Sequence, residues 1–400
     1  MRGYRRRRVA IASCYDKHNY GSMLQAYATQ KVVEELGYEA VTIDKAGLDA
    51  DISRGRRSYY LENLSNFAFL KSKAGFVRHK VKRKLSKDFG RKISQRDYAF
   101  DCFARDSFVL SPRFGSFSEL SDYCSECDTV LVGSDQLWLP VNIAGDYYTL
   151  SFVGQNTKKV AYSTSFGVSS LPEKYLLEVS DFLESFDAVS VRELTGASII
   201  RKACNLDVPV VCDPTMLLDK EAWFSIANSD YVASDSPYIF CYFLGKNIWN
   251  RQCARLLAEK KHCKIVALTH IDEHIAFDDG YADFQPYDVG PSEFLQLIAN
   301  AEYVCTDSFH GTVFSCLFGR PFFSFRRHES NGSQSTNSRI DTLLEKLCLQ
   351  DRACATKDDF SSILDKQIDF SGVEAAIGEY RSFSMSFLQE ALRIEEGCDD

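Results

Sequence analysis

The feature of this sequence that most constrains its fold is a repeated alternation of short β-rich runs with longer amphipathic segments. Runs rich in β-branched residues, such as 8–14 (RVAIASC) and 303–306 (YVCT), are each followed by a polar turn and then by apolar residues at helical spacing. Alternating strands and helices are typical of parallel sheets that helices cover on both faces. The sequence therefore predicts an α/β fold.

Most of the chain follows this alternation. Strands are expected at 8–14, 39–44, 129–133, 159–163, 188–191, 208–212, 238–245, 263–268, 303–306 and 322–325, and helices at 23–36, 248–260, 292–301, 312–318 and 383–395. Ser22 is the expected N-cap of the first helix. Turn signals at both ends of 213–236, which include Pro214 and the adjoining Pro237, mark a boundary. We therefore expect two α/β domains facing each other across a cleft, at 1–215 and 216–375, and a C-terminal helix in 376–400.

Composition and charge exclude several classes of protein. The 400 residues are 45% hydrophobic and 26% charged, as in ordinary globular proteins, and the net charge of −8 disfavours a nucleic-acid-binding surface. No apolar run reaches the roughly 18 residues of a membrane-spanning helix. We expect a cytoplasmic protein, in which the fourteen cysteines are reduced. Motifs for nucleotide phosphates, zinc proteolysis, esterase chemistry and dinucleotides are missing, so neither a metal nor a cofactor is expected.

A basic segment at about 50–110 interrupts the first domain. Between Arg54 and Arg96, fourteen basic residues face two acidic ones, so this stretch carries +12 and the rest of the chain −20. Apolar residues at 76, 77, 81, 85, 89 and 93 recur at helical intervals. Two interpretations stay open: a helix that contacts anionic lipid or an anionic substrate, or a solvated helix that covers the edge of a domain.

Polar residues after the strands predict a site, because ligands of open parallel sheets bind outside the carboxyl ends of the strands. The sharpest segment is 306–322 (TDSFHGTVFSCLFGRPF), in which a strand is expected to end and a helix to begin near Gly311. The N–H groups at such a helix start can bind an anion, and His310 beside them suits proton transfer. The alternative for His310 is a capping or packing role.

Other strand ends offer a cation, a carboxylate and an amide. Arg192 can pair with a carboxylate or phosphate of a ligand, or with a protein acid such as Glu193. Asp135 and Gln136, within 133–138 (GSDQLW), suit sugar hydroxyls, and Asp135 is equally suited to capping its own loop. Positive charge on the side of His310 comes from Arg326, Arg327, His328 and Arg339.

Seven segments, in order along the chain, resemble the polysaccharide pyruvyl transferase family. They are 19–30 (NYGSMLQAYATQ), 133–138, 161–167 (AYSTSFG), 190–193 (SVRE), 213–218 (DPTMLL), 291–322 and 338–347 (SRIDTLLEKL). The resemblance implies two Rossmann-like domains, arranged as in GT-B glycosyltransferases. It also implies transfer of a pyruvyl group from phosphoenolpyruvate to two hydroxyls of a sugar, which gives a cyclic ketal. Leu139 departs from the family, which often has asparagine there.

The resemblance also suggests roles for individual residues. His310 is the expected catalytic acid. The expected donor-binding residues are Arg192, Ser308, Gly311, Thr312, Lys246, Arg326 and Arg339, and the expected acceptor-binding residues are Asn19, Tyr20, Gly21, Ser134, Asp135 and Gln136. The acceptor belongs to a cell-surface polysaccharide, such as an exopolysaccharide or capsule, or to its lipid-linked precursor, whose diphosphate the basic segment could hold at the inner face of the membrane.

Two other functions stay open at this stage. One is a GT-B glycosyltransferase that uses a nucleotide sugar, and the other is a non-catalytic anion-binding protein on the same fold. A nucleotide sugar would need a base pocket and diphosphate contacts in the second domain. Incorporation from a nucleotide sugar, with none from phosphoenolpyruvate, would separate the first alternative from pyruvyl transfer.

Overall fold

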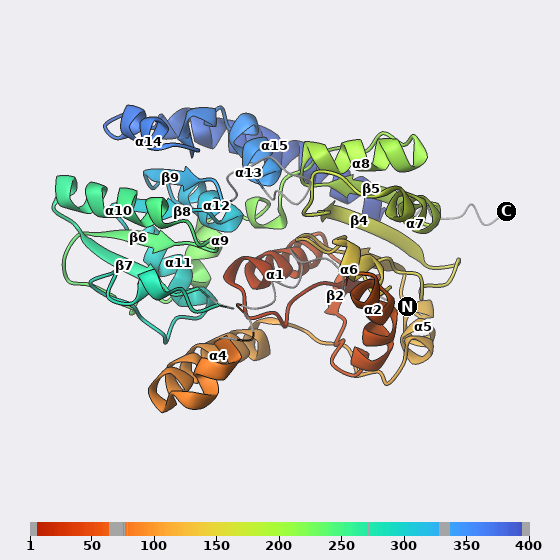
Figure 1. Cartoon of the computed structure of the whole chain (residues 1–400). Coiled ribbons are helices and arrows are strands. Elements are labelled where there is room, and N and C mark those ends of the chain that lie inside the picture. The colour runs from red at the N-terminus through yellow and green to blue at the C-terminus, as the bar shows by residue number, and fades with distance from the viewer. Residues whose placement is uncertain are drawn as a thin grey trace.

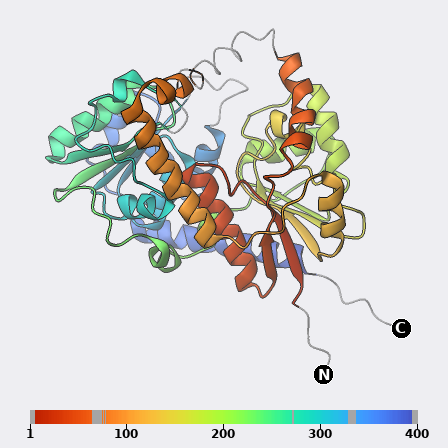
Figure 2. The ribbon, with the colours of Figure 1, turned by 90° about the horizontal axis from the view of Figure 1, so that it is seen from below.

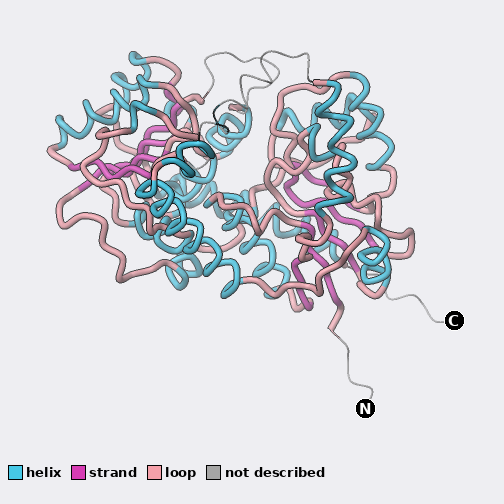
Figure 3. Tube along the Cα trace, turned by 60° about the horizontal axis from the view of Figure 1, so that its bottom comes forward, coloured by secondary structure: helices cyan, strands magenta, loops and turns pink. Residues whose placement is uncertain are grey.

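The fold contains two parallel β-sheets, each flanked by helices (Figure 1). The structure, a computed structural model, describes residues 6–63, 75, 77, 79–270, 273–327 and 337–393. Figure 3 shows the strands gathered into two separate groups. Each sheet has five strands, and all neighbouring strands pair in parallel. The prediction of an α/β fold with two Rossmann-like domains is confirmed.

The N-terminal sheet has the strand order β2-β1-β3-β4-β5. Its strands are β1 (Arg8–Ala12), β2 (Glu39–Thr42), β3 (Thr129–Val132), β4 (Lys158–Thr164) and β5 (Ala188–Val191). Its helices are α1 (Tyr20–Glu35), α5 (Phe117–Ser125), α6 (Pro140–Ile143), α7 (Glu173–Leu183) and α8 (Leu194–Cys204). The prediction of a strand at 208–212 is wrong, because that segment forms only an isolated bridge between Val191 and Val210.

The C-terminal sheet has the order β10-β9-β8-β6-β7. Its strands are β6 (Tyr238–Tyr242), β7 (Lys264–Leu268), β8 (Tyr303–Thr306), β9 (Phe322–Phe325) and β10 (Ala353–Cys354). Its helices are α9 (Lys220–Ile226), α10 (Ile248–Lys261), α11 (Pro291–Ala299), α12 (Phe309–Leu317), α13 (Ser338–Lys346) and α14 (Lys357–Ile363). Numbered within its own domain, each sheet runs 2-1-3-4-5, so each has a topological switch point between its first and third strands.

Two helices begin three residues earlier than the sequence predicts. α1 starts at Tyr20 because Asn19, and not Ser22, is its N-cap. The side chain of Asn19 accepts a hydrogen bond from the backbone N–H of Ser22, which lies within the helix. α12 starts at Phe309 because Ser308 caps it in the same way. The prediction of Ser22 as N-cap is therefore wrong.

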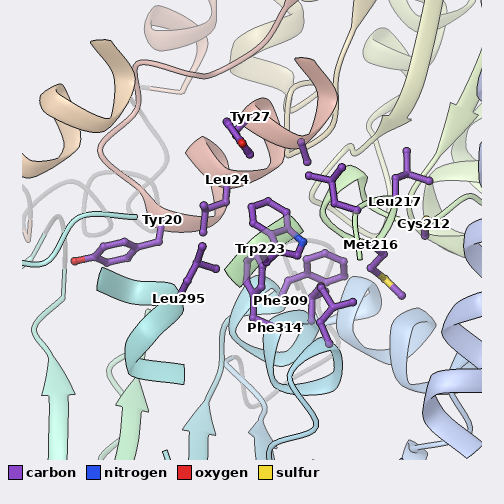
Figure 4. Close-up of a cluster of buried hydrophobic side chains, with 14 of the residues drawn as sticks. Tyr20, Leu24, Tyr27, Cys212, Met216, Leu217, Trp223, Leu295, Phe309 and Phe314 are labelled. Carbon is purple, nitrogen blue, oxygen red and sulfur yellow. The ribbon is translucent and has the colours of Figure 1, made fainter. Parts of the chain in front are cut away.

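An aromatic cluster joins the two domains. Tyr20 of α1 stacks on Phe294 of α11, with ring centroids 4.6 Å apart, and its hydroxyl donates to the carbonyl of Val289. Trp223 of α9 lies between α1 and α12, as Figure 4 shows, and contacts the ring of Phe314 edge-on at 5.0 Å. Buried aromatic pairs of this kind stabilise an interface beyond their burial alone. The cluster thus fixes the position of α1 relative to the second domain.

The last helix, α15 (Phe370–Leu392), begins earlier than expected and also ties the domains together (Figure 1). Ser384 accepts a hydrogen bond from the backbone N–H of Cys212, and Arg381 donates to the carbonyls of Met216 and Leu218. Because α15 also packs against β4, it contacts both halves of the chain.

The basic segment is helical where the structure describes it. It contains α2 (Asp49–Glu62), a helical stretch at 79–85 and α4 (Lys87–Ser107), and Ser86 interrupts the last two by capping α4. α4 crosses to the second domain and packs on α11 (Figure 2). The apolar position 76 lies outside the described residues. None of the helices in the described ranges combines the length and hydropathy of a membrane span.

Candidate functional site

The two topological switch points meet at one cavity between the domains. The loop after β1 supplies Lys17 and Asn19 to its wall, the first turn of α1 supplies Ser22, and the loop after β3 supplies Asp135 and Gln136. The second domain contributes Leu244 after β6, His270 after β7 and Arg327 after β9, together with Ser308, Phe309 and His310 at the start of α12 and Arg339 at the start of α13. The cavity has a volume of about 170 Å³. The wall therefore consists of loops at strand ends and the starts of three helices, as expected for open parallel sheets.

His310 lies in the first turn of α12 and is pressed against α1. A Cβ atom on Gly21 would lie only 2.0 Å from the imidazole Nδ1, so the ring occupies the space that a side chain at position 21 would need. The imidazole Nε2 lies 3.4 Å from Oδ2 of Asp213. Two residues of the first domain thus hold this ring of the second domain in place, and the ring remains part of the cavity wall.

Asp213 is a buried hub beneath the site. Its Oδ2 accepts hydrogen bonds from Arg192 at 2.6 Å and from Ser134 at 2.9 Å, and its Oδ1 accepts from the backbone and hydroxyl of Thr215. Burial would raise the pKa of this carboxyl, but His310 and Arg192 outweigh it and hold the pKa below its usual value. Asp213 is therefore ionised, and its carboxylate faces the imidazole of His310.

Asp135 is the carboxylate in the cavity wall. Its backbone adopts φ = 81°, in the left-handed region, which turns the side chain towards Ser22 and Arg192. Burial alone would raise its pKa, but the charges of Lys17, Arg192 and His310 and the hydrogen bond from Ser22 lower the pKa below the ordinary value. Arg192 is thus occupied by two protein carboxylates, those of Asp213 and Asp135, and its guanidinium lies over the ring of Phe309 at 4.5 Å.

Of the cavity cations, Arg339 has the least favourable electrostatic environment. It is only 6% exposed, and no carboxylate of the described part of the chain forms an ion pair with it. Burial and the neighbouring charges of Arg192 and Arg327 lower its pKa to about 9. Arg327 donates one hydrogen bond to the carbonyl of Asp307, and Lys17 completes the positive wall. The carboxylates of Asp135 and Glu193 lie near enough to oppose this shift but do not cancel it, so the buried guanidinium favours an anion in the cavity.

The expected donor residues separate into two groups. Two of the seven, Ser308 and Arg339, line the cavity beside the expected catalytic acid His310. The other five lie elsewhere or are already paired. Arg192 pairs with Asp213 and Asp135, Lys246 with Glu273, and Arg326 with Asp341 at 2.9 Å. Thr312 hydrogen bonds to Ser308 and Ser324, and the N–H of Gly311 donates to the helix cap Ser308. Gly311 instead packs against Thr306, where a Cβ would lie 2.6 Å from the hydroxyl oxygen.

The expected acceptor residues separate in the same way. Asn19, Asp135 and Gln136 line the cavity. Tyr20 lies in the interdomain aromatic cluster, Gly21 makes room for His310, and Ser134 holds Asp213 from below.

The sequence reasoning did not select Lys17, Ser22, His270 or Arg327 as binding residues. The rule that strand ends face the ligand applies to Lys17, in the loop after β1, and to His270, two residues after the end of β7, but it does not assign either of them a role. It could not have chosen Arg327 over Arg326, since both follow β9 and only the ion pair with Asp341 separates them.

Together these features define a two-domain α/β protein with a cation-lined interdomain cavity and a buried histidine–aspartate pair. The chain belongs to the polysaccharide pyruvyl transferase family, whose sequence model matches residues 19–329. It is therefore a transferase that modifies polysaccharide, with a saccharide as acceptor. No curated protein is significantly similar to the chain.

Several solved structures of low sequence identity are similar to the chain. UDP-GlcNAc 2-epimerase from Neisseria meningitidis is 9% identical, covers 96% of this chain and 100% of its own, and has a TM-score of 0.47. MurG from Acinetobacter baumannii is 9% identical, with coverages of 96% and 99% and a TM-score of 0.43. ADP-heptose lps heptosyltransferase II from E. coli is 11% identical, with coverages of 93% and 99% and a TM-score of 0.38. These values are too low to carry a statement about substrates.

Proposed function

We propose that the protein transfers a pyruvyl group from phosphoenolpyruvate to two hydroxyls of a sugar in a cell-surface polysaccharide or its lipid-linked precursor. The observation that carries this proposal is the unpaired, buried guanidinium of Arg339 beside His310 in one small cavity. Phosphoenolpyruvate carries a phosphate and a carboxylate, so its site needs several cations. Lys17, Arg327 and Arg339 would bind these groups, and each charge-assisted hydrogen bond contributes roughly 1.5–3 kcal/mol.

His310 would act as the general acid. Addition of the first sugar hydroxyl to C2 of the enol phosphate requires a proton on the methylene carbon, which His310 would donate from the cavity wall. Asp213, whose Oδ2 lies 3.4 Å from the imidazole Nε2, would hold the ring in position for this transfer. A general acid held in position typically increases the reaction rate by a factor of about 10²–10⁴.

The second hydroxyl would then displace phosphate and close the ketal. Of the two hydroxyl protons, one restores the proton that His310 gave to the methyl group, and the other leaves with phosphate. Arg327 and Arg339 stabilise the departing charge. Asn19 and Gln136 lie on the N-terminal wall, where they can contact the sugar. The proposed reaction uses phosphoenolpyruvate as co-substrate and needs no metal or further cofactor. We propose that it takes place in the cytoplasm, at the inner face of the membrane.

Mass spectrometry tests the proposal directly. Candidate acceptors are incubated with phosphoenolpyruvate or with nucleotide sugars, and the products are analysed for a pyruvyl ketal and for released phosphate. We expect the ketal, together with phosphate, from phosphoenolpyruvate alone. Glycosyl transfer from a nucleotide sugar, with no product from phosphoenolpyruvate, would reject the proposal in favour of a glycosyltransferase. Binding of phosphoenolpyruvate without turnover on any acceptor would favour a non-catalytic anion-binding protein.

A further inference from the structure

One face of the basic segment is apolar and unpartnered. Val77, Val81 and Leu85 follow one another at helical spacing, and their side chains are 59%, 48% and 81% exposed. Val77 and Val81 line a groove of about 630 Å³ between the stretch at 79–85 and the first turns of α4, and Leu85 lies at the end of that stretch. The remaining lining of the groove contains lysines, one arginine, a serine and a glycine, with no acidic residue.

The cations of this segment fall into two sets. One set has acidic partners: Lys82 lies 4.0 Å from Asp279, Arg83 pairs with Asp97 at 2.9 Å, and Arg91 and Lys92 share Asp88. In contrast, Lys80, Lys84 and Lys87 line the groove and form no ion pair with any residue that the structure describes. Free ammonium groups therefore surround the exposed apolar strip.

We infer that this surface, formed by Val77, Lys80, Val81, Lys84, Leu85 and Lys87, docks the protein on an anionic membrane. Cations alone would suit a soluble acidic polymer equally well, but such a polymer does not require the apolar strip. A bilayer surface takes both, because the apolar side chains enter the boundary of the acyl chains while the lysines meet anionic headgroups. The net charge of −8 on the whole chain makes general attraction to such a surface unfavourable, so binding must come from this local patch.

The position of this surface relative to the cavity indicates where the acceptor would be met, an inference that rests on the proposed function. Gly75, at the start of the same segment, lies against the carboxylate of Glu273, and the backbone N–H of Glu273 donates to Nδ1 of His270. His270 lines the cavity. Docking through this segment would hold the C-terminal wall of the cavity close to the bilayer, where a lipid-linked saccharide is available.

Vesicle co-sedimentation of the full-length protein tests the inference. The vesicles contain phosphatidylcholine alone or phosphatidylcholine with phosphatidylglycerol. We expect binding only to the anionic vesicles, and weaker binding at high salt. The double variant Lys80→Gln/Lys84→Gln should bind about thirty-fold more weakly, from the loss of two surface-facing lysines. The double variant Val81→Ser/Leu85→Ser should bind at least about tenfold more weakly.

A matched control removes two exposed lysines elsewhere. Lys202→Gln/Lys220→Gln changes the net charge by the same amount on other faces and should leave vesicle binding unchanged. All four substituted positions are exposed, so thermal unfolding should stay the same in the test variants.

Three outcomes would overturn the inference: no binding to anionic vesicles, equal weakening by the control variant, or binding to soluble dextran sulfate that matches vesicle binding and ignores the Val81→Ser/Leu85→Ser change. The last would assign the surface to an acidic polymer. Pyruvyl transfer to a soluble saccharide separates this inference from the proposed function. Transfer without vesicle binding rejects the docking surface alone, and vesicle binding without transfer from phosphoenolpyruvate rejects the reaction alone.

Discussion

Replacement of Arg339 by methionine should make the empty protein more stable and bind phosphoenolpyruvate less well. A guanidinium stays charged at pH 7, and burial together with Arg192 and Arg327 lowers the pKa of Arg339 to about 9. At about 1.4 kcal/mol for each pKa unit, its charge costs the folded protein on the order of 5 kcal/mol. Solvent in the cavity screens part of this cost, so Arg339→Met should raise the free energy of unfolding by about 2 kcal/mol.

Phosphoenolpyruvate should narrow or close this difference in stability, because it stabilises the wild type more than the variant. A saturating anion that binds only the folded state stabilises it by about 2.7 kcal/mol at one hundred times its Kd. The loss of one charge-assisted bond of about 1.5–3 kcal/mol should weaken phosphoenolpyruvate binding by roughly 10- to 150-fold. Denaturant unfolding with and without phosphoenolpyruvate, combined with titration calorimetry, measures both effects.

Arg326→Met is the matched control, because Arg326 is close in sequence to the cavity residue Arg327 but pairs with Asp341 away from the cavity. It should change stability by less than about 1 kcal/mol and leave phosphoenolpyruvate binding unchanged. If Arg339→Met lowered the stability of the empty protein, or if phosphoenolpyruvate stabilised both variants equally, Arg339 would not be a strained anion-binding cation and the reasoning would fail.

Two further variants test the support of the imidazole. Gly21→Ala places a Cβ 2.0 Å from Nδ1 of His310, so kcat should fall by about a hundredfold while the free energy of unfolding falls by only about 1–3 kcal/mol. The control Gly378→Ala, at a position with open space around it, should change neither quantity. Normal turnover by Gly21→Ala would show that the ring need not stay in place. Asp213→Asn leaves the buried Arg192 short of a counter-charge and should cost about 3–5 kcal/mol. Because folding lowers the pKa of Asp213, its contribution to stability is complete above about pH 4 and is lost as the pH falls further, so acid unfolding of Asp213→Asn should depend less on pH. A variant as stable as the wild type at pH 7 would remove Asp213 from this role.

Strand positions could be predicted where apolar runs are short and bounded. β5, β8 and β9 match their expected ranges because β-branched or aromatic residues fill them and polar turns follow. The segment 208–212 has the same composition but pairs at a single position, Val210. Apolar composition indicates burial, and here burial comes from packing beside β5 rather than from a place in the sheet.

The candidate site could be predicted as a region but not side chain by side chain. Its location at the strand ends follows from the α/β alternation, which places Asp135, Gln136 and His310 together. The environment of Tyr20 depends on Phe294, which lies far along the chain, so its aromatic side chain next to a glycine could equally have indicated a ligand contact. Likewise, the partner of Lys246 is Glu273, and no local pattern reveals that pair.

The most direct test of the central claim is single-turnover transfer from phosphoenolpyruvate by the wild type and by His310→Ala, with donor binding measured in parallel. We predict that transfer slows by at least about a hundredfold while the Kd for phosphoenolpyruvate changes little, because the cations bind the donor and the imidazole supplies the proton. Unchanged transfer, or a loss confined to donor binding, would contradict the account.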